Sequence, residues 1–238
     1  MAGRVRVNGR LAAKAGSPVP AGALLEVQAS PAYVSRGGDK LAAALAAFAL
    51  DVADREVLDI GASTGGFTDA LLTHGARRVT ALDVGYGQLA WKLRSDSRVT
   101  VIERTNFRTL GDGAFPNGFD LIVVDASFIS VRTIVARAAA YLRPGGSIVA
   151  LVKPQFEAGR SRIGGGGVVR DPAVHRAILA EVRDALPALG LVAVDALTSP
   201  LRGPAGNIEF FYRIMQSGVP VDDARLDALV AAAHRPEA

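Results

Sequence analysis

From residue 56 onward, apolar residues follow two alternating patterns. Short apolar runs predict strands, and the stretches between them, whose apolar positions recur at spacings of three and four, predict helices. The predicted strands span 56–60, 78–84, 98–104, 119–125, 147–152, 191–197 and 207–215. The predicted helices span 65–75, 87–96, 132–142 and 172–190. This alternation is typical of an α/β fold with a mostly parallel sheet covered by helices on both faces.

The first part of the chain follows a different pattern. "VRVNGR" (5–10) contains an Asn-Gly turn signal and "GALLEV" (22–27) is a second extended run, so a small β element is predicted there. "RGGDKLAAALAAFAL" (36–50) then predicts a helix that leads into the first strand of the sheet. We therefore expect a small element at 1–29, an α/β domain at 30–216 and a helical tail at 217–238.

Composition limits the chemistry. The 238 residues include no cysteine, which excludes a disulfide framework and a thiolate metal site, and three scattered histidines give no metal-ligand spacing. No metal is therefore expected, and a reducing, cytoplasmic setting fits. The N-terminus lacks the apolar segment of a signal peptide, and the longest uncharged helical run, 41–50, is far below the roughly 18 residues of a membrane span. We expect a soluble protein without a membrane partner.

Positive charge is concentrated at the start of the chain. Residues 1–40 carry a net charge of +4, which equals that of the whole chain. Clustered basic side chains favour contact with a polyanion, because they exchange condensed counterions for phosphate contacts. A solvated arm that only aids solubility is the alternative. The candidate RNA-binding residues are Arg4, Arg6, Arg10, Lys14 and Arg36.

"LDIGASTGGF" (58–67) reads as a strand, a glycine-rich turn and the start of a helix. Glycines let a ligand approach the backbone, and the helix start offers free N–H groups. An acid before the glycines and another about twenty residues later resembles the cofactor site of S-adenosylmethionine (SAM) methyltransferases. Tight turns of any doubly wound fold are the alternative. The candidate cofactor residues are Asp59, Gly61, Ser63, Thr64, Gly65, Gly66, Phe67, Asp83, Val84, Asn106 and Asp125.

Two lysines and two carboxylates fall at predicted strand ends or at the start of a helix: Lys40, Asp125, Lys153 and Glu209. Strand ends converge on the ligand crevice of an open α/β sheet, so these side chains are expected to meet. A ribose hydroxyl is a poor nucleophile, and a lysine can accept its proton where a neighbouring cation and low dielectric favour the neutral amine. We assign that role to Lys153, oriented by the two carboxylates and influenced by Lys40. Unrelated surface charges are the alternative.

The same four residues match, in order and context, the K-D-K-E tetrad of FtsJ-like ribose 2'-O-methyltransferases. "YVSRGGDKLAAAL", "LDIGASTGGFTDALL", "DVGYGQLAWKLR", "DASFIS", "LVKPQFEAGR" and "GNIEFF" resemble the TlyA (haemolysin A) family more closely, over about residues 3–214. The resemblance implies a Rossmann-like SAM-dependent methyltransferase fold with a seven-stranded sheet. It also implies 2'-O-methylation of cytidines in ribosomal RNA, with ribosomal RNA or ribosomal subunits as partner.

The resemblance further implies an N-terminal S4-type RNA-binding domain. Family members begin with two short helices, whereas this chain starts inside that domain, so residues 1–29 are expected to form a partial S4-type element. Either the true start lies upstream or the segment is naturally deleted. Two alternative functions stay open: a membrane-active haemolysin, and a noncatalytic RNA-binding protein of ribosome assembly.

Overall fold

The computed structural model describes residues 5–12, 14, 16–27, 31–111, 113–159 and 162–235. The chain divides into two units, residues 1–32 and residues 33–238. Within the described residues, no helix combines the length and the apolar character needed to cross a membrane. The same part of the chain holds no group of three or more histidine, aspartate and glutamate side chains that could bind a metal ion.

The smaller unit contains a three-stranded antiparallel sheet in the order β2-β1-β3. Its strands are β1 (Val5–Val7), β2 (Arg10–Leu11) and β3 (Leu25–Val27). Asn8 and Gly9 join β1 to β2 with φ angles of 50° and 77°, as the Asn-Gly signal predicted. Leu11, Leu25 and Val27 are all more than half exposed. This sheet therefore buries little apolar surface of its own.

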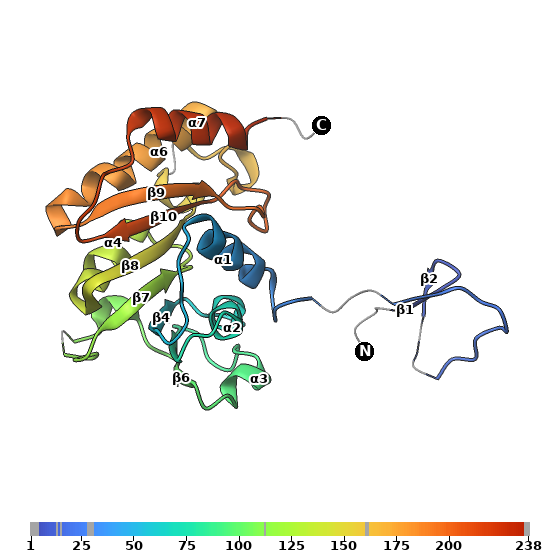
Figure 1. Cartoon of the computed structure of the whole chain (residues 1–238). Coiled ribbons are helices and arrows are strands. Elements are labelled where there is room, and N and C mark those ends of the chain that lie inside the picture. Colours follow the sequence, from blue (N-terminus) through green and yellow to red (C-terminus); the bar gives the residue numbers. More distant parts are fainter. Residues whose placement is uncertain are drawn as a thin grey trace. The chain divides into compact units, whose positions relative to one another are not determined.

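The larger unit is built on a seven-stranded sheet in the order β6-β5-β4-β7-β8-β10-β9 (Figure 1). Strands β6 to β8 in that order run parallel, and β10 is antiparallel to both β8 and β9. The prediction of a mostly parallel, seven-stranded sheet is thus confirmed. The strands are β4 (Glu56–Ile60), β5 (Arg78–Leu82), β6 (Val99–Ile102), β7 (Phe119–Val124), β8 (Leu142–Val152), β9 (Val192–Thr198) and β10 (Phe210–Met215).

Helices cover both faces of this sheet, because successive side chains of each buried strand point to opposite sides. Val57 and Phe211 pack with α1 and α2, whereas Leu58 and Phe210 pack with α4, α6 and α7. The α-helices are α1 (Arg36–Ala47), α2 (Gly66–Thr73), α3 (Trp91–Arg94), α4 (Val131–Ala138), α5 (Pro154–Glu157), α6 (Pro172–Ala185) and α7 (Asp223–Ala233). The 3₁₀ turns are η1 (Phe107–Thr109), η2 (Ala139–Tyr141), η4 (Gly165–Gly167) and η5 (Pro187–Leu189).

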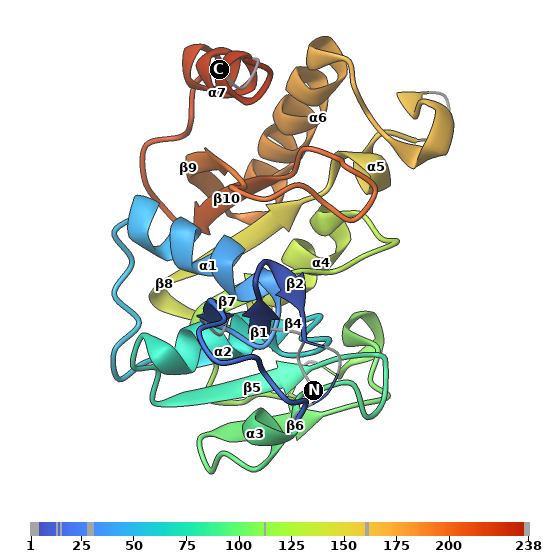
Figure 2. The same cartoon turned by 90° about the vertical axis from the view of Figure 1, so that its right-hand side faces the viewer.

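One element differs from the prediction. The helix expected at 87–96 is reduced to the four residues of α3, because Gly85 and Gly87 hold the preceding segment in a turn and Gly87 has a φ of 71°. At the C-terminus, α7 buries Leu226 and Val230 against the sheet and α6, so it belongs to the larger unit (Figure 2). The carboxyl ends of β4, β5, β7 and β8 lie at one edge of the sheet, where ligands bind in such folds.

Candidate active site

The turn between β4 and α2 brings two strand ends together. Gly61 has a φ of 86°, and a Cβ atom there would lie 2.7 Å from the carbonyl oxygen of Asp125. Its backbone N–H donates to the carbonyl of Leu82 on β5. A side chain at Gly61 would therefore separate the ends of β4 and β7, which must stay in contact to form the site.

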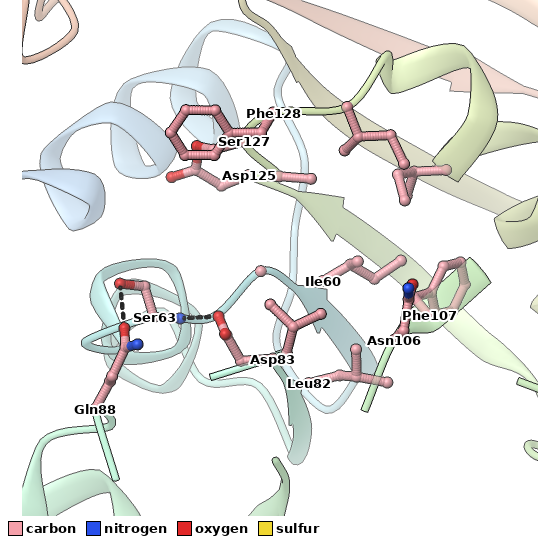
Figure 3. A pocket seen from close by; sticks show the side chains of 15 residues that line it. Ile60, Ser63, Leu82, Asp83, Gln88, Asn106, Phe107, Asp125, Ser127 and Phe128 are labelled. Carbon is pink, nitrogen blue, oxygen red and sulfur yellow. Dashed lines mark hydrogen bonds between the residues drawn. The ribbon is translucent and has the colours of Figure 1, made fainter. Parts of the chain in front are cut away.

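A cavity of about 390 Å³ opens beside this turn, and we call it the strand-end cavity. It is bounded by the ends of β4, β5 and β7 and by the start of α4 (Figure 3). Its lining residues are Ile60, Gly61, Ser63, Leu82, Asp83, Val84, Gln88, Asn106, Phe107, Asp125, Ala126, Ser127, Phe128, Ile129 and Ile134. Apolar side chains form much of this lining, and six polar side chains, two of them aspartates, complete it.

Asp83 is one of the two acidic residues that line this cavity, with Asp125. One carboxylate oxygen accepts a hydrogen bond from the N–H of Ser63 (2.8 Å), and the other accepts one from the N–H of Gly85 (2.7 Å). Figure 3 shows the Ser63 bond, and Gln88 beyond it. These two hydrogen bonds hold the Asp83 carboxylate in place. Each of its oxygens keeps a second lone pair, so Asp83 can still accept hydrogen bonds from the hydroxyl groups of a ligand.

Asp59 lies behind the glycine turn and is fully buried. One oxygen accepts a hydrogen bond from the hydroxyl of Thr68 at 2.6 Å, and the other has no hydrogen-bond partner within the described part of the chain. Burial raises the pKa of Asp59 to about 7, the Thr68 bond opposes this shift, and the charges of Asp125 and Asp83 add to it. Leaving a buried carboxyl oxygen without a hydrogen bond costs free energy. The unpartnered oxygen of Asp59 is therefore suited to accept a hydrogen bond from a ligand or from a water molecule.

A second cavity, of about 270 Å³, contains both lysines of the predicted tetrad, and we call it the lysine cavity. Lys40 forms an ion pair with Glu209 at 2.5 Å. Lys153 forms an ion pair with Asp125 at 2.6 Å and donates a hydrogen bond to the hydroxyl of Ser127 at 2.9 Å. Both lysines and Glu209 are buried. The structure thus brings the four predicted residues into one cavity, as two ion pairs.

Four elements position these groups. Lys40 lies in the first turns of α1, Asp125 follows β7, Lys153 is the N-cap of α5 directly after β8, and Glu209 precedes β10. The loop before β10 passes close to Glu209, because a Cβ atom on Gly203 would lie only 2.6 Å from the Glu209 carboxylate. The sequence interpretation placed both carboxylates around Lys153, whereas in the structure Glu209 pairs with Lys40.

The two cavities share one wall. Gly61, Ser63, Asp125 and Ser127 line both of them. A ligand in the strand-end cavity and a second ligand in the lysine cavity would therefore meet at Asp125, next to the Lys153 amine. Such an arrangement suits the transfer of a group between two bound molecules.

The remaining predicted residues lie in several different places. Val84 and Asn106 line the strand-end cavity, and Thr64, Gly66, Phe67 and Arg36 line the lysine cavity. Gly65 lines neither cavity: its φ is 97°, and a Cβ atom there would collide with Leu93, so it serves the packing of α2 on α3. Arg6, Arg10 and Lys14 belong to the smaller unit, and Arg4 lies outside the described residues.

Sequence reasoning missed three residues of the site. Gln88 lines the strand-end cavity, and Ser127 and Phe128 follow Asp125 into it. Phe128 has a φ of 63° and an 89 % exposed side chain, a strained conformation for an aromatic residue. The only available signal was the segment "DASF", in which two further side chains follow the catalytic candidate at a strand end.

Comparisons with known proteins agree with this geometry. The family model of the FtsJ-like methyltransferases matches residues 33–214. The "16S/23S rRNA (cytidine-2'-O)-methyltransferase TlyA" of Mycobacterium tuberculosis is 50% identical over 213 residues, which cover 88% of this chain and 79% of that protein. "Hemolysin A" of Brachyspira hyodysenteriae is 40% identical, with 88% of each chain covered.

Solved structures give the same result. The structure described as "Putative hemolysin from Streptococcus thermophilus" superposes with a TM-score of 0.82 at 43% identity, over 98% of this chain and 87% of that one. The family model covers the glycine turn, Asp83 and all four residues of the lysine cavity that the sequence singled out. This chain therefore belongs to the FtsJ-like methyltransferase family.

Proposed function

We propose that the protein transfers a methyl group from SAM to the ribose 2'-oxygen of a cytidine in ribosomal RNA. The observation that carries this proposal is the wall shared by the two cavities, at which Asp125 and Lys153 lie. The relatives support the substrate, because the M. tuberculosis protein is named as an rRNA (cytidine-2'-O)-methyltransferase. The strand-end cavity would hold SAM, and the lysine cavity would hold the target nucleotide.

The residues of the strand-end cavity fit SAM. Asp83 can accept the two ribose hydroxyls, and Gly61 leaves room for a ligand to approach the backbone. Leu82, Val84 and Phe107 offer apolar surface to an adenine ring, and Asn106 offers a polar group at its edge. The unpartnered oxygen of Asp59 suits an ammonium group, directly or through a water molecule. SAM would supply an electrophilic methyl group on its sulfonium sulfur.

Lys153 would handle the proton of the ribose hydroxyl. The hydroxyl oxygen must lose its proton as it gains the methyl group, so a base or a fixed positive charge next to it lowers the barrier. Asp125 and Ser127 hold the Lys153 nitrogen in place through contacts of 2.6 Å and 2.9 Å. To act as the base, the ion-paired ammonium must first release its own proton to solvent; the neutral amine then accepts the hydroxyl proton.

The Lys40–Glu209 pair would form the opposite wall of the nucleotide site. Its two charges compensate each other inside a buried position, so the pair can orient a ribose without adding net charge. Arg36, at the start of α1, lines the same cavity and could contact a phosphate of the target nucleotide.

The smaller unit would contribute RNA affinity. Arg6, Arg10 and Lys14 are exposed on or next to its short strands, and Arg4 precedes them in the sequence. Basic side chains on an exposed β element can bind phosphates without reading sequence. We propose that residues 1–29 act as a partial S4-type RNA-binding element, that residues 30–216 form the methyltransferase domain with 217–238 as its C-terminal extension, and that the partner is ribosomal RNA or a ribosomal subunit.

A transfer assay tests this function. The purified protein is incubated with SAM carrying a tritiated methyl group and with ribosomal subunits, or their extracted RNA, from cells that lack the enzyme. We expect label in ribosomal RNA, on a ribose that resists alkaline hydrolysis at its 3' side because the 2'-oxygen is blocked. Label on a base instead of a sugar, or no label in either substrate, would contradict the proposal.

A further inference from the structure

A third cavity lies on the other side of the loop that carries Glu209. It has a volume of about 670 Å³, and its charged lining comes from Arg170, Arg202 and Arg235, with His234 beside them. Val168, Val169 and Ile208 form apolar walls. We call this cavity the arginine pocket. Neither the cofactor site nor the lysine cavity uses any of these side chains.

Three separate segments bring the arginines together. Arg170 directly precedes α6, Arg202 lies in the loop before β10, and Arg235 follows the end of α7. All three side chains belong to exposed residues. These segments gather at the edge of the larger unit near the end of α7 (Figure 1). Sequence reasoning could not detect the cluster, because the three residues are distant in the chain.

These arginines differ from the arginines on the adjacent helices α6 and α7. Arg176 and Arg183 on α6 and Arg225 on α7 each form an ion pair with an aspartate. Within the described part of the chain, Arg170, Arg202 and Arg235 have no carboxylate at ion-pair distance. Arg170 and Arg202 each donate one hydrogen bond to a backbone carbonyl, at 3.4 Å and 3.3 Å. A guanidinium has five N–H donors, so most of theirs stay available.

The nearby acid does not neutralise the pocket. Asp171 caps α6, because its carboxylate accepts a hydrogen bond from the N–H of Ala173 at 2.8 Å. The lining residues that the structure describes include three arginines and no carboxylate, so the cavity has a net positive charge. The combination of guanidinium groups with apolar walls suits phosphates and the faces of bases more than it suits a small free anion.

One loop separates the arginine pocket from the proposed nucleotide site. In the loop before β10, Pro204 and Glu209 line the lysine cavity, whereas Ala205, Gly206 and Ile208 line the arginine pocket. A polynucleotide chain with its target ribose at Lys153 would therefore meet the arginine pocket after crossing this loop. Because phosphates repeat along an RNA strand, several of them could contact the arginines of the pocket at once.

We infer that the arginine pocket binds the phosphate backbone of the single-stranded RNA segment that flanks the target nucleotide. The inference takes the RNA substrate from the proposed function and adds a second RNA contact within the larger unit. Phosphate contacts of this kind fix the register of the RNA without reading its bases. The pocket would therefore align the target ribose with Lys153.

Binding of a labelled single-stranded RNA of about twelve nucleotides, followed by fluorescence anisotropy at several salt concentrations, tests this inference on the full chain. The test variant carries Arg170→Gln, Arg202→Gln and Arg235→Gln. We expect affinity to fall about tenfold or more, and the slope of log affinity against log salt to flatten by about 2, since each phosphate contact contributes about 0.7. SAM affinity and the thermal midpoint should stay unchanged, because the three side chains are exposed.

A matched control removes the same charge at the opposite edge of the sheet. Arg55, Arg77 and Arg78 are exposed and clustered at the amino ends of β4 and β5, and their replacement by Gln should change RNA affinity less than about twofold. Replacing the three pocket arginines by Lys should retain most of the affinity, because phosphate contacts depend mainly on charge. Equal losses in the two Gln triples, or unchanged affinity in the pocket triple, would overturn the inference.

Two further outcomes separate this inference from the proposed function. If the wild-type protein transferred no methyl group to ribosomal RNA, the proposed function would fail, while the anisotropy experiment would still decide whether the pocket binds RNA. If the pocket triple lost turnover only on assembled subunits and bound the oligonucleotide like wild type, the RNA assignment would be wrong. That second result would point to an acidic ribosomal protein as the occupant.

Discussion

The two cavities of the active site treat buried charge in opposite ways. In the lysine cavity each buried lysine has a carboxylate partner at 2.5–2.6 Å. Behind the strand-end cavity, Asp59 is fully buried; Thr68 donates to one of its oxygens, and the other has no hydrogen-bond partner within the described residues. An ion-pair partner compensates for the lost hydration of a buried charge, whereas burial without a cation favours the neutral form of a carboxyl. At Asp59, burial raises the pKa of the carboxyl to about 7.

This difference suits the two proposed tasks. A group that handles a proton in every turnover needs a fixed position, which the Lys153 contacts to Asp125 and Ser127 provide. A group that waits for a cationic part of a ligand can stay partly unsatisfied until the ligand arrives. Substitutions in the two regions should therefore change different quantities. In the lysine cavity they should change turnover. In and behind the strand-end cavity they should change ligand affinity or the pH dependence of stability.

The largest effect is expected at Lys153. Replacing it by Ala should lower turnover by about 10²–10⁴-fold, the usual contribution of a positioned acid or base, while SAM affinity changes little. Lys153→Arg should fail almost as badly, because a guanidinium does not release its proton near neutral pH. The assay is single-turnover methyl transfer to ribosomal RNA.

The control for this prediction is Lys92→Ala. Lys92 is exposed and forms a 2.8 Å ion pair with Asp69 outside the lysine cavity, so turnover should be unaffected. If Lys153→Arg methylated RNA at nearly the wild-type rate, the amine would act only as a fixed positive charge. The proton would then pass to Asp125 or to solvent, and the two cavities would differ less than proposed.

The next effect concerns Asp59 and the stability of the ligand-free protein. Its pKa rises from 3.8 to about 7 on folding, so the folded state binds this proton more tightly than the unfolded state does. The free energy of unfolding that comes from this proton is present below pH 4 and is lost as the pH rises from 4 through 7. A shift of about three units corresponds to about 4 kcal/mol. Asp59→Asn should abolish this loss, so urea unfolding should show the variant gaining on wild type as pH increases.

Asp96→Asn provides a control of opposite sign. The pKa of Asp96 is lowered, chiefly by the hydrogen bond from the Arg98 guanidinium, so its contribution is present at neutral pH and lost in acid. If Asp59→Asn and wild type showed parallel stability curves between pH 5 and 9, Asp59 would be ionised throughout and a cation or water would already satisfy it.

How far the sequence could predict this protein depends on the range of the signal. Apolar periodicity predicted every strand of the large sheet, and "LDIGASTGG" predicted the turn that contains Gly61, since both signals are local. The contact of Lys153 with Asp125 was predicted, but the partner of Lys40 was not, because β10 enters the sheet between β8 and β9 and carries Glu209 to Lys40. The arginine pocket escaped notice for the same reason.

A smaller effect is expected at Asp83. Asp83→Ala removes the carboxylate that faces the strand-end cavity, and losing charge-assisted hydrogen bonds to ligand hydroxyls should weaken SAM binding by about 10- to 100-fold. The N–H groups of Ser63 and Gly85 lose their acceptor as well. Titration calorimetry with SAM gives the affinity, and the exposed Asp39→Ala provides a matched loss of charge. Unchanged affinity would remove Asp83 from the cofactor site.

The smallest effect is expected from the arm of the smaller unit, which neither cavity uses. Replacing Arg6, Arg10 and Lys14 together by Gln should flatten the salt dependence of RNA binding, by at most about 2 in the log–log slope, because these exposed side chains contribute only phosphate contacts. SAM affinity should not change. The Arg55, Arg77 and Arg78 triple again controls for net charge. An unchanged slope would assign the arm to solubility, and RNA binding would then rest on the larger unit, where Arg36 and the arginine pocket flank the lysine cavity.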